Sequence, residues 1–273
     1  MSDTLVVNEI YLSLQGESTF AGLPCVFVRL TVCNLRCSYC DTAYAFTEGR
    51  KMAVADVRAS VNELAKPFAP TWNEPTPDPS LEGNGPTAHV SQFPSPGGAR
   101  GGFSRLPLVE LTGGEPLLQP NALPLMKSLC DDGFTVLVET SGALDISKVD
   151  PRVRRIMDLK CPSSGEVERN RLENIPHLKA TDEIKFVIAT KEDYEWAKAQ
   201  IAAHKLDTIC PLLMSWVHPL TPTQQDKSLK KVPPGQTLIG RQWLAEKIIA
   251  DALAVRFQAQ LHKIIWPPEQ RGV

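Results

Sequence analysis

The sequence predicts an α/β fold, a partial and modified (β/α) barrel built on a parallel sheet. Short apolar segments of strand length alternate along the chain with longer segments of helical pattern, and such alternation produces parallel sheets with crossovers. Residues with chemical character follow the predicted strands, at the edge where parallel α/β folds place their sites. Because 42% of the 273 residues are hydrophobic, we expect one domain over residues 1–273 with a sizeable core.

The predicted elements follow one another in a regular order. Before the first strand, residues 8–18 (NEIYLSLQGES) are expected to form a turn that contains Gly16. No clear helix connects the third and fourth strands, and the second helix ends at Gly133, a residue type that commonly ends helices. Strands are expected at 26–32, 108–112, 134–139, 155–159, 183–189, 209–215 and 260–265, and helices at 54–66, 121–132, 192–204 and 241–254.

One segment differs in composition from the rest of the chain. Residues 67–106 contain eight prolines and six glycines in forty positions. Such a composition is typical of disorder, because few apolar residues are present to form a core. We therefore expect a flexible insertion between the first helix and the strand at 108–112, and a functional lid is the alternative.

Three cysteines, Cys33, Cys37 and Cys40, have the spacing Cys-x3-Cys-x2-Cys. Three thiolates can hold three irons of a [4Fe–4S] cube and leave the fourth iron open to a ligand that is not protein. Closed zinc sites need four ligands, and ordinary iron–sulfur carriers supply a fourth thiolate. Zinc bound with help from a distant cysteine or a histidine is the alternative, although no second cysteine pair of zinc spacing occurs. The other cysteines are expected to be buried structural thiols: Cys25, Cys130, Cys161 and Cys210.

A second motif, Gly113-Gly114-Glu115-Pro116, follows the strand predicted at 108–112. Two glycines allow a sharp turn and a close approach to a ligand, and the proline can start the next helix. Together with the cysteine spacing, this motif resembles the radical S-adenosylmethionine (SAM) enzymes. In that superfamily the open iron binds SAM, and an electron from the cluster releases a 5′-deoxyadenosyl radical. Backbone groups and the Glu of the Gly-Gly-Glu-Pro segment, here Glu115, hold the SAM amino group.

Further residues narrow the resemblance to one family. The segment LQGE at 14–17, Arg29, the loop 33–42, ETSG at 139–142 and the C-terminal segment 262–268 resemble 7-carboxy-7-deazaguanine synthase. That family converts 6-carboxy-5,6,7,8-tetrahydropterin into 7-carboxy-7-deazaguanine with loss of ammonia, in the biosynthesis of 7-deazapurines such as the queuosine precursor. The resemblance therefore implies a lyase that regenerates SAM and uses Mg²⁺ to orient the substrate carboxylate.

The resemblance also implies roles for the residues at matching positions. Cys33, Cys37 and Cys40 would hold the [4Fe–4S] cluster, and Thr42 would supply an oxygen ligand to Mg²⁺, which prefers oxygen. The expected SAM contacts are Tyr39, Cys40, Asp41, Gly114, Ser141 and Lys160, with a late adenine contact near 215–218. The expected pterin contacts are Leu14, Gln15, Gly16, Arg29, Thr112, His262 and Pro268.

Arg29 can also be interpreted without the resemblance. It interrupts the apolar run VFVRLTV, and a buried arginine needs a partner. Its planar guanidinium could bind the substrate carboxylate through two hydrogen bonds. A surface charge is the alternative.

Length and composition agree with a cytoplasmic enzyme. The net charge of −2 and the pI of about 6.2 leave no basic surface typical of nucleic-acid binding. No apolar run is long enough for a membrane span, and the N-terminal residues do not resemble a signal peptide. The resemblance further implies a homodimer and a reducing protein such as a flavodoxin or ferredoxin.

Two other functions stay open at this point. A radical-SAM activase that acts on a partner protein would share the cysteine loop and the Gly-Gly-Glu-Pro segment. A non-enzymatic, cysteine-rich metal-binding protein would need neither that segment nor Arg29. One departure from the family is also visible: its chains commonly end near the position of Pro268, whereas residues 269–273 follow here.

Overall fold

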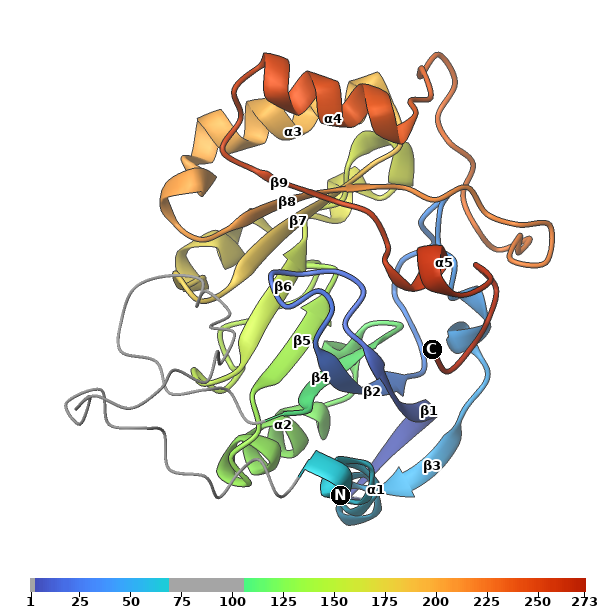
Figure 1. Cartoon of the computed structure of the whole chain (residues 1–273), viewed down its shortest axis with the longest axis vertical. Coiled ribbons are helices and arrows are strands. Elements are labelled where there is room, and N and C mark those ends of the chain that lie inside the picture. Colours follow the sequence, from blue (N-terminus) through green and yellow to red (C-terminus); the bar gives the residue numbers. More distant parts are fainter. Residues whose placement is uncertain (1–2, 69–105) are drawn as a thin grey trace, which may run out of the picture.

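The computed structural model describes residues 3–68 and 106–273 and confirms the α/β class (Figure 1). In these residues, nine strands form one open sheet in the order β3-β1-β2-β4-β5-β6-β7-β8-β9. The insertion expected at 67–106 lies almost wholly outside the described residues. No helix in the described part of the chain has the length and apolar character that a membrane span requires.

Most of the sheet is parallel, and only the pairings of β1 with its two neighbours are antiparallel. β1 (Thr4–Leu14) pairs antiparallel with β2 and with β3 (Arg50–Ala53). The parallel strands are β2 (Pro24–Leu30), β4 (Leu108–Gly113), β5 (Val136–Thr140), β6 (Arg154–Asp158), β7 (Glu183–Ile188), β8 (Leu212–Trp216) and β9 (Arg256–Gln258).

The helices pack in two groups, each with its own apolar core. α1 (Val54–Ala65) and α2 (Ala122–Asp131) share a core with β1, β2, β4 and β5. α3 (Lys191–His204) and α4 (Arg241–Ala250) share a second core with β6, β7 and β8, and Tyr194 meets Trp243 edge to face at 5.6 Å. Figure 1 shows these two helix groups at opposite ends of the molecule.

The predictions for helices are more accurate than those for the two chain ends. α1, α2 and α3 match the predicted ranges to within one residue at each end, whereas α4 ends at Ala250 instead of 254. As expected, no helix joins β5 to β6. The predicted turn at 8–18 is wrong over its first half, because those residues belong to β1.

The strand predicted at 260–265 is also wrong. The last strand, β9, lies earlier in the chain, and His262–Ile265 form the one-turn helix α5. Leu261 and Ile265 are four residues apart, and the Ile265 amide donates to the Leu261 carbonyl at 3.1 Å. Since a short apolar run fits a strand and a helix equally well, the sequence did not distinguish them.

Side-chain alternation along the parallel strands creates the face on which the site lies. On β4, Val109 and Leu111 point to the helix-covered core, whereas Leu108, Glu110 and Thr112 lie on the other face. Parallel register puts Arg29 of β2 beside Thr112. This second face has an apolar floor and becomes polar toward the carboxyl ends of the strands; the floor contains Phe20, Cys25, Phe27, Leu108, Leu137 and Ile156.

Val32 connects β2 to the cysteine loop in a backbone conformation that valine rarely adopts. Its φ of 77° lies in the left-handed region, where a side chain with a Cβ costs about 1–2 kcal/mol. Two hydrogen bonds hold it there: its amide donates to the Ala45 carbonyl at 3.0 Å, and its carbonyl accepts from the Glu115 amide at 2.8 Å. The strain therefore lies directly before Cys33.

We expect Val32→Gly to raise the free energy of unfolding by up to about 1 kcal/mol. Relief of the left-handed strain outweighs the extra freedom, about 0.5–1 kcal/mol, that glycine gives the unfolded chain. Chemical denaturation of the metal-free protein measures the effect. Val232→Gly is the matched control, since Val232 is also exposed but has no left-handed φ, and it should lower stability. A loss of stability in Val32→Gly would contradict this account.

Candidate functional site

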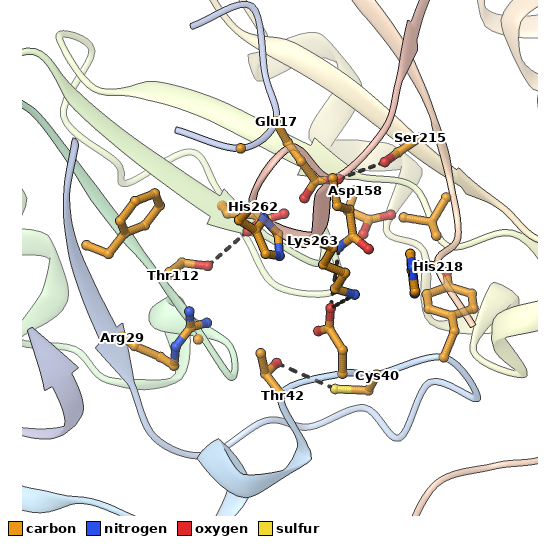
Figure 2. Close-up of a pocket in the computed structure, with 18 of the residues that line it drawn as sticks. Glu17, Arg29, Cys40, Thr42, Thr112, Asp158, Ser215, His218, His262 and Lys263 are labelled. Atoms are coloured by element: carbon orange, nitrogen blue, oxygen red, sulfur yellow. Dashed lines mark hydrogen bonds and ion pairs between the residues drawn. The ribbon is translucent and has the colours of Figure 1, made fainter. Parts of the chain in front are cut away.

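One open cavity at the carboxyl ends of the parallel strands brings the sequence-predicted site residues together (Figure 2). They come from the turn after β1, from β2 and the loop after it, from the ends of β4, β5 and β6, and from the C-terminal segment. The predicted residues that line the cavity are Leu14, Gln15, Gly16, Arg29, Cys33, Cys37, Tyr39, Cys40, Asp41, Thr42, Thr112, Gly114, Ser141, Lys160, His262 and Pro268.

The three clustered cysteines lie on the loop after β2 and face this cavity as free thiols. The loop is ordered by its own contacts: the Leu35 amide donates to the Cys33 Sγ at 3.4 Å, and the Cys40 Sγ lies 3.7 Å from the Thr42 Oγ1. Within residues 3–68 and 106–273, no three His, Cys, Asp or Glu side chains converge as a site for one metal ion. A four-iron cube does not require its ligands to converge on one ion, because each thiolate binds a separate iron. Three soft sulfur donors around one cavity therefore fit such a cluster.

Burial makes these thiols weak acids when no metal is bound. It raises the pKa of Cys37 to about 12, and it also raises the pKa values of Cys33 and Cys40. Since only thiolates ligate iron, cluster assembly must release protons from this loop.

The Gly-Gly-Glu-Pro segment packs against the cysteine loop. A Cβ at Gly114 would lie 2.0 Å from the Val32 carbonyl oxygen, and Gly113 has a φ of +114°. The close approach that these glycines permit is therefore to protein backbone, which sets the position of the loop before Cys33. Pro116 begins a short 3-10 helix, as predicted.

Glu115 is fully buried and contributes nothing to the cavity lining. Its carboxylate accepts hydrogen bonds from the Leu117 amide, from the Thr140 hydroxyl, and from the amide and hydroxyl of Ser141 at 2.8 and 2.6 Å. Here it joins the ends of β4 and β5, whereas the resemblance implied a contact with the SAM amino group.

Arg29 is mostly buried, with 13% of its side chain exposed, and it is partnered, as its place in an apolar strand required. Its Nε donates to Glu9 at 2.7 Å, and its Nη2 donates to the Tyr11 hydroxyl at 2.7 Å. The Tyr44 hydroxyl donates to the same Glu9 carboxylate at 3.1 Å. Figure 2 shows Arg29 and Thr42 on the same side of the cavity. These contacts fix the guanidinium in position while it still lines the cavity.

The C-terminal segment packs against the turn after β1, and both segments line the cavity. The Leu261 amide donates to the Gly16 carbonyl at 3.0 Å, and a Cβ at Gly16 would lie 2.5 Å from the His262 Nδ1, so a larger residue there would displace the His262 ring. Lys263 forms an ion pair with Asp41 of the cysteine loop. Although burial favours the neutral acid, the Lys263 ammonium lowers the pKa of Asp41 to about 2.

Residues 269–273, which the family resemblance did not cover, line the same cavity. The Arg271 guanidinium lies over the Tyr44 ring, 3.7 Å from its centroid, and pairs with Glu48 at 2.7 Å. The segment is thereby attached to the residues directly after the cysteine loop. The Gln224 amide also donates to the Pro268 carbonyl at 3.0 Å.

The residues expected to contact SAM lie on the cysteine loop and directly after β4, β5 and β6. Lys160 pairs with Asp158 at 2.6 Å, and this carboxylate keeps the pKa of Lys160 well above its usual value although burial opposes the charge. The Tyr39 hydroxyl is buried without a hydrogen-bond partner among the described residues. The stretch expected to meet the adenine also reaches the cavity through Ser215, Trp216, Val217 and His218.

Sequence reasoning missed a group of charged side chains on the inner face of the sheet. Lys185 pairs with Glu139 and, at 3.4 Å, with Glu17. The Glu17 carboxylate also accepts from the Ser215 hydroxyl at 2.7 Å, as Figure 2 shows. Glu110 lies beside this group, one step deeper on β4. A polar residue at alternate positions of an otherwise apolar strand was the signal that could have found them.

The chain is similar to known 7-carboxy-7-deazaguanine synthases over nearly its whole length. It is 39% identical over 268 residues to that of Koribacter versatilis, which covers 98% of this chain and 99% of the relative. It is 36% identical over 272 residues to that of Chlorobaculum tepidum, with 98% and 97% covered. Its fold is similar to that of QueE from Escherichia coli, with a TM-score of 0.62, 19% identity and 95% of both chains covered. No protein-family model matches the chain.

Proposed function

The chain belongs to the 7-carboxy-7-deazaguanine synthase family, and from this premise we propose which of its residues take part in the reaction. The protein is a radical-SAM lyase with a [4Fe–4S] cluster and SAM. It contracts the ring of 6-carboxy-5,6,7,8-tetrahydropterin to 7-carboxy-7-deazaguanine on the route to the queuosine precursor. This membership decides against the activase and the non-enzymatic metal-binding protein.

We propose that Cys33, Cys37 and Cys40 hold the cluster and that SAM lies between the cysteine loop and the ends of β4, β5 and β6. When bound, these two groups supply the one-electron chemistry that removes a hydrogen atom from the pterin. The protein's part is to position SAM, and the residues proposed for it are Tyr39, Cys40, Asp41, Gly114, Ser141 and Lys160. All six line the same cavity as the three cysteines, which supports this assignment.

The substrate carboxylate is proposed to bind Arg29. The observation that carries this assignment is that a guanidinium held by Glu9 and Tyr11 opens onto the same cavity as the three cysteines. A fixed planar donor suits a carboxylate. We further propose that Thr42, beside Cys40, supplies an oxygen to a Mg²⁺ that the same carboxylate also ligates.

The pterin ring is proposed to lie against the turn after β1 and the C-terminal segment. Contact between Gly16 and His262 joins these two segments into one wall. The proposed ring contacts are Leu14, Gln15, Gly16, Thr112, His262 and Pro268. Reduction by a flavodoxin or ferredoxin, and a homodimeric assembly, are also proposed; both rest on the family resemblance.

The test is anaerobic reconstitution of the cluster, followed by incubation with SAM, a reductant, Mg²⁺ and the tetrahydropterin, with mass spectrometry of the small molecules. We expect 7-carboxy-7-deazaguanine to accumulate without a matching loss of SAM, and to form more slowly without Mg²⁺. Formation of 5′-deoxyadenosine with no deazapurine would contradict the proposed substrate. Zinc in place of iron would contradict the cluster assignment. Thr42→Ala should remove the response to Mg²⁺ while iron content stays unchanged.

A further inference from the structure

Glu110 is a buried acid for which neither the fold nor the proposed chemistry yet accounts. It lies in the middle of β4 with 4% of its surface exposed, and it lines the cavity. Its register partners on the neighbouring strands are Phe27 and Leu137, so it lies just above the apolar floor. The side chain of Glu110 therefore lies at the bottom of the space in which the pterin ring is proposed to bind.

The surroundings of Glu110 favour a neutral carboxylic acid. In the described part of the chain its one hydrogen-bond partner is the Gln15 amide, whose Nε2 donates to the Glu110 Oε2 at 2.5 Å. The nearby cation, Lys185, is already paired with Glu139 and Glu17. An ionised Glu110 would be a buried carboxylate without a counter-ion beside two other carboxylates, which is costly.

The titration of the neighbours agrees with this geometry. Burial, together with the neighbouring Glu139 carboxylate, raises the pKa of Glu110 to about 8. Lys185 lowers the pKa of Glu139 to about 2 although burial opposes this. Below Glu110, burial raises the pKa of the Cys25 thiol well above its usual range, so that group is neutral too. At neutral pH Glu139 is thus ionised, and Glu110 keeps its proton.

We propose that Glu110 is a substrate-positioning residue that, as a neutral acid, donates a hydrogen bond from the cavity floor to the pterin ring. Its Oε2 accepts from Gln15, which leaves the proton on Oε1. The same contact orients Gln15, whose Oε1 accepts from the Glu17 amide at 3.2 Å. Glu110 therefore fixes the turn after β1 and also offers a donor to a ring that has acceptors like those of guanine. This inference rests on the proposed function.

Two variants of Glu110 separate this role from a purely structural one. Glutamine has the shape of the neutral acid: its oxygen can accept from Gln15 and its NH₂ can donate into the cavity. We expect Glu110→Gln to keep KM and kcat at neutral pH. Glu110→Ala removes both hydrogen bonds and should raise KM for the pterin about tenfold, with a smaller change in kcat. Glu183→Gln is the control, because Glu183 is a buried acid on β7 that does not line the cavity.

The pH dependence gives the second readout. In the wild type, ionisation of Glu110 above about pH 8 adds a negative charge that faces an anionic substrate, so KM should rise with pH. Glu110→Gln cannot ionise at this position, so its KM should not rise in this way. Because the pterin titrates equally in the assays of both enzymes, the comparison also separates ionisation of Glu110 from ionisation of the substrate. Infrared spectroscopy of the protein without substrate should show a protonated-carboxyl band that is lost in Glu110→Gln and kept in Glu183→Gln.

The outcomes distinguish this inference from the proposed function. If the wild type forms the deazapurine but Glu110→Gln loses as much affinity as Glu110→Ala, a charged carboxylate is required and the inference is overturned. The same conclusion follows if Glu110→Ala has the wild-type KM, or if no carboxyl band is lost in Glu110→Gln. If the wild type forms no deazapurine, the proposed function fails together with the inference.

Discussion

Replacing Cys37 by alanine will abolish both iron binding and product formation. Its thiol is one of three that face the cavity, and a cube held by two thiolates has two open irons, so the cluster will not persist through purification. We expect iron and sulfide contents near zero after anaerobic reconstitution, and no deazapurine by mass spectrometry. Retention of a full iron content would contradict the assignment of Cys37.

The chain offers a closely matched control for this experiment. Cys210 is buried to a similar degree, at 7% exposure against 8% for Cys37, and burial raises the pKa of both thiols to about 12. It lies in the apolar core beneath α3 and α4, away from the cavity. Cys210→Ala should lose about 1 kcal/mol of stability and keep both iron and activity. Equal loss of iron in the two variants would show that the effect is general unfolding.

Arg29→Lys will lower kcat/KM for the pterin by about 10–100-fold, because lysine cannot replace a planar donor that is held by two partners and aimed at a carboxylate. Arg29→Ala will lower it further. Without the guanidinium, the half-buried Glu9 carboxylate loses its ion pair beside an anionic substrate. Most of the loss should appear in KM, since binding of the carboxylate precedes the chemistry. Steady-state kinetics with the reconstituted enzyme measures both constants.

Arg58→Ala is the control for Arg29. Arg58 also pairs with a carboxylate, Asp132, but at an exposed site on α1 outside the cavity. Its loss should leave both kinetic constants unchanged, as surface ion pairs contribute little. The double variant Glu9→Gln/Arg29→Ala should recover part of the lost affinity, because the uncompensated charge is gone. An Arg29→Lys enzyme with wild-type KM would show that another group binds the carboxylate.

Much of the chemistry could be predicted from short stretches of sequence. The spacing of Cys33, Cys37 and Cys40 and the Gly-Gly-Glu-Pro turn are local patterns, and the structure brings both to one cavity. Helices α1, α2 and α3 also follow from local periodicity and were predicted to within a residue at each end. The sequence also predicted that Arg29 needs a partner, and in the structure that partner is Glu9. The single domain and the residue roles remain predictions.

Other features required the folded chain. The carboxylate of Glu115, for which the resemblance implies a contact with SAM, joins β4 to β5, and no local pattern predicts this. β1 was missed, and α5 was predicted as a strand, because short amphipathic runs are ambiguous until a neighbour covers one face. Contact between Gly16 and His262 joins the two ends of the chain, and no local pattern predicts it.

The sequence by itself determined the cluster loop, the family and the helices α1, α2 and α3, since each depends on residues close together in the chain. Only the tertiary structure decided which face of each strand lines the cavity. That choice assembles Glu17, Glu139 and Lys185 into a charged group and leaves Glu110 beside it without a cation. The charge state of a carboxyl depends on burial and on neighbours within a few ångströms, and in a parallel sheet those neighbours come from separate crossovers.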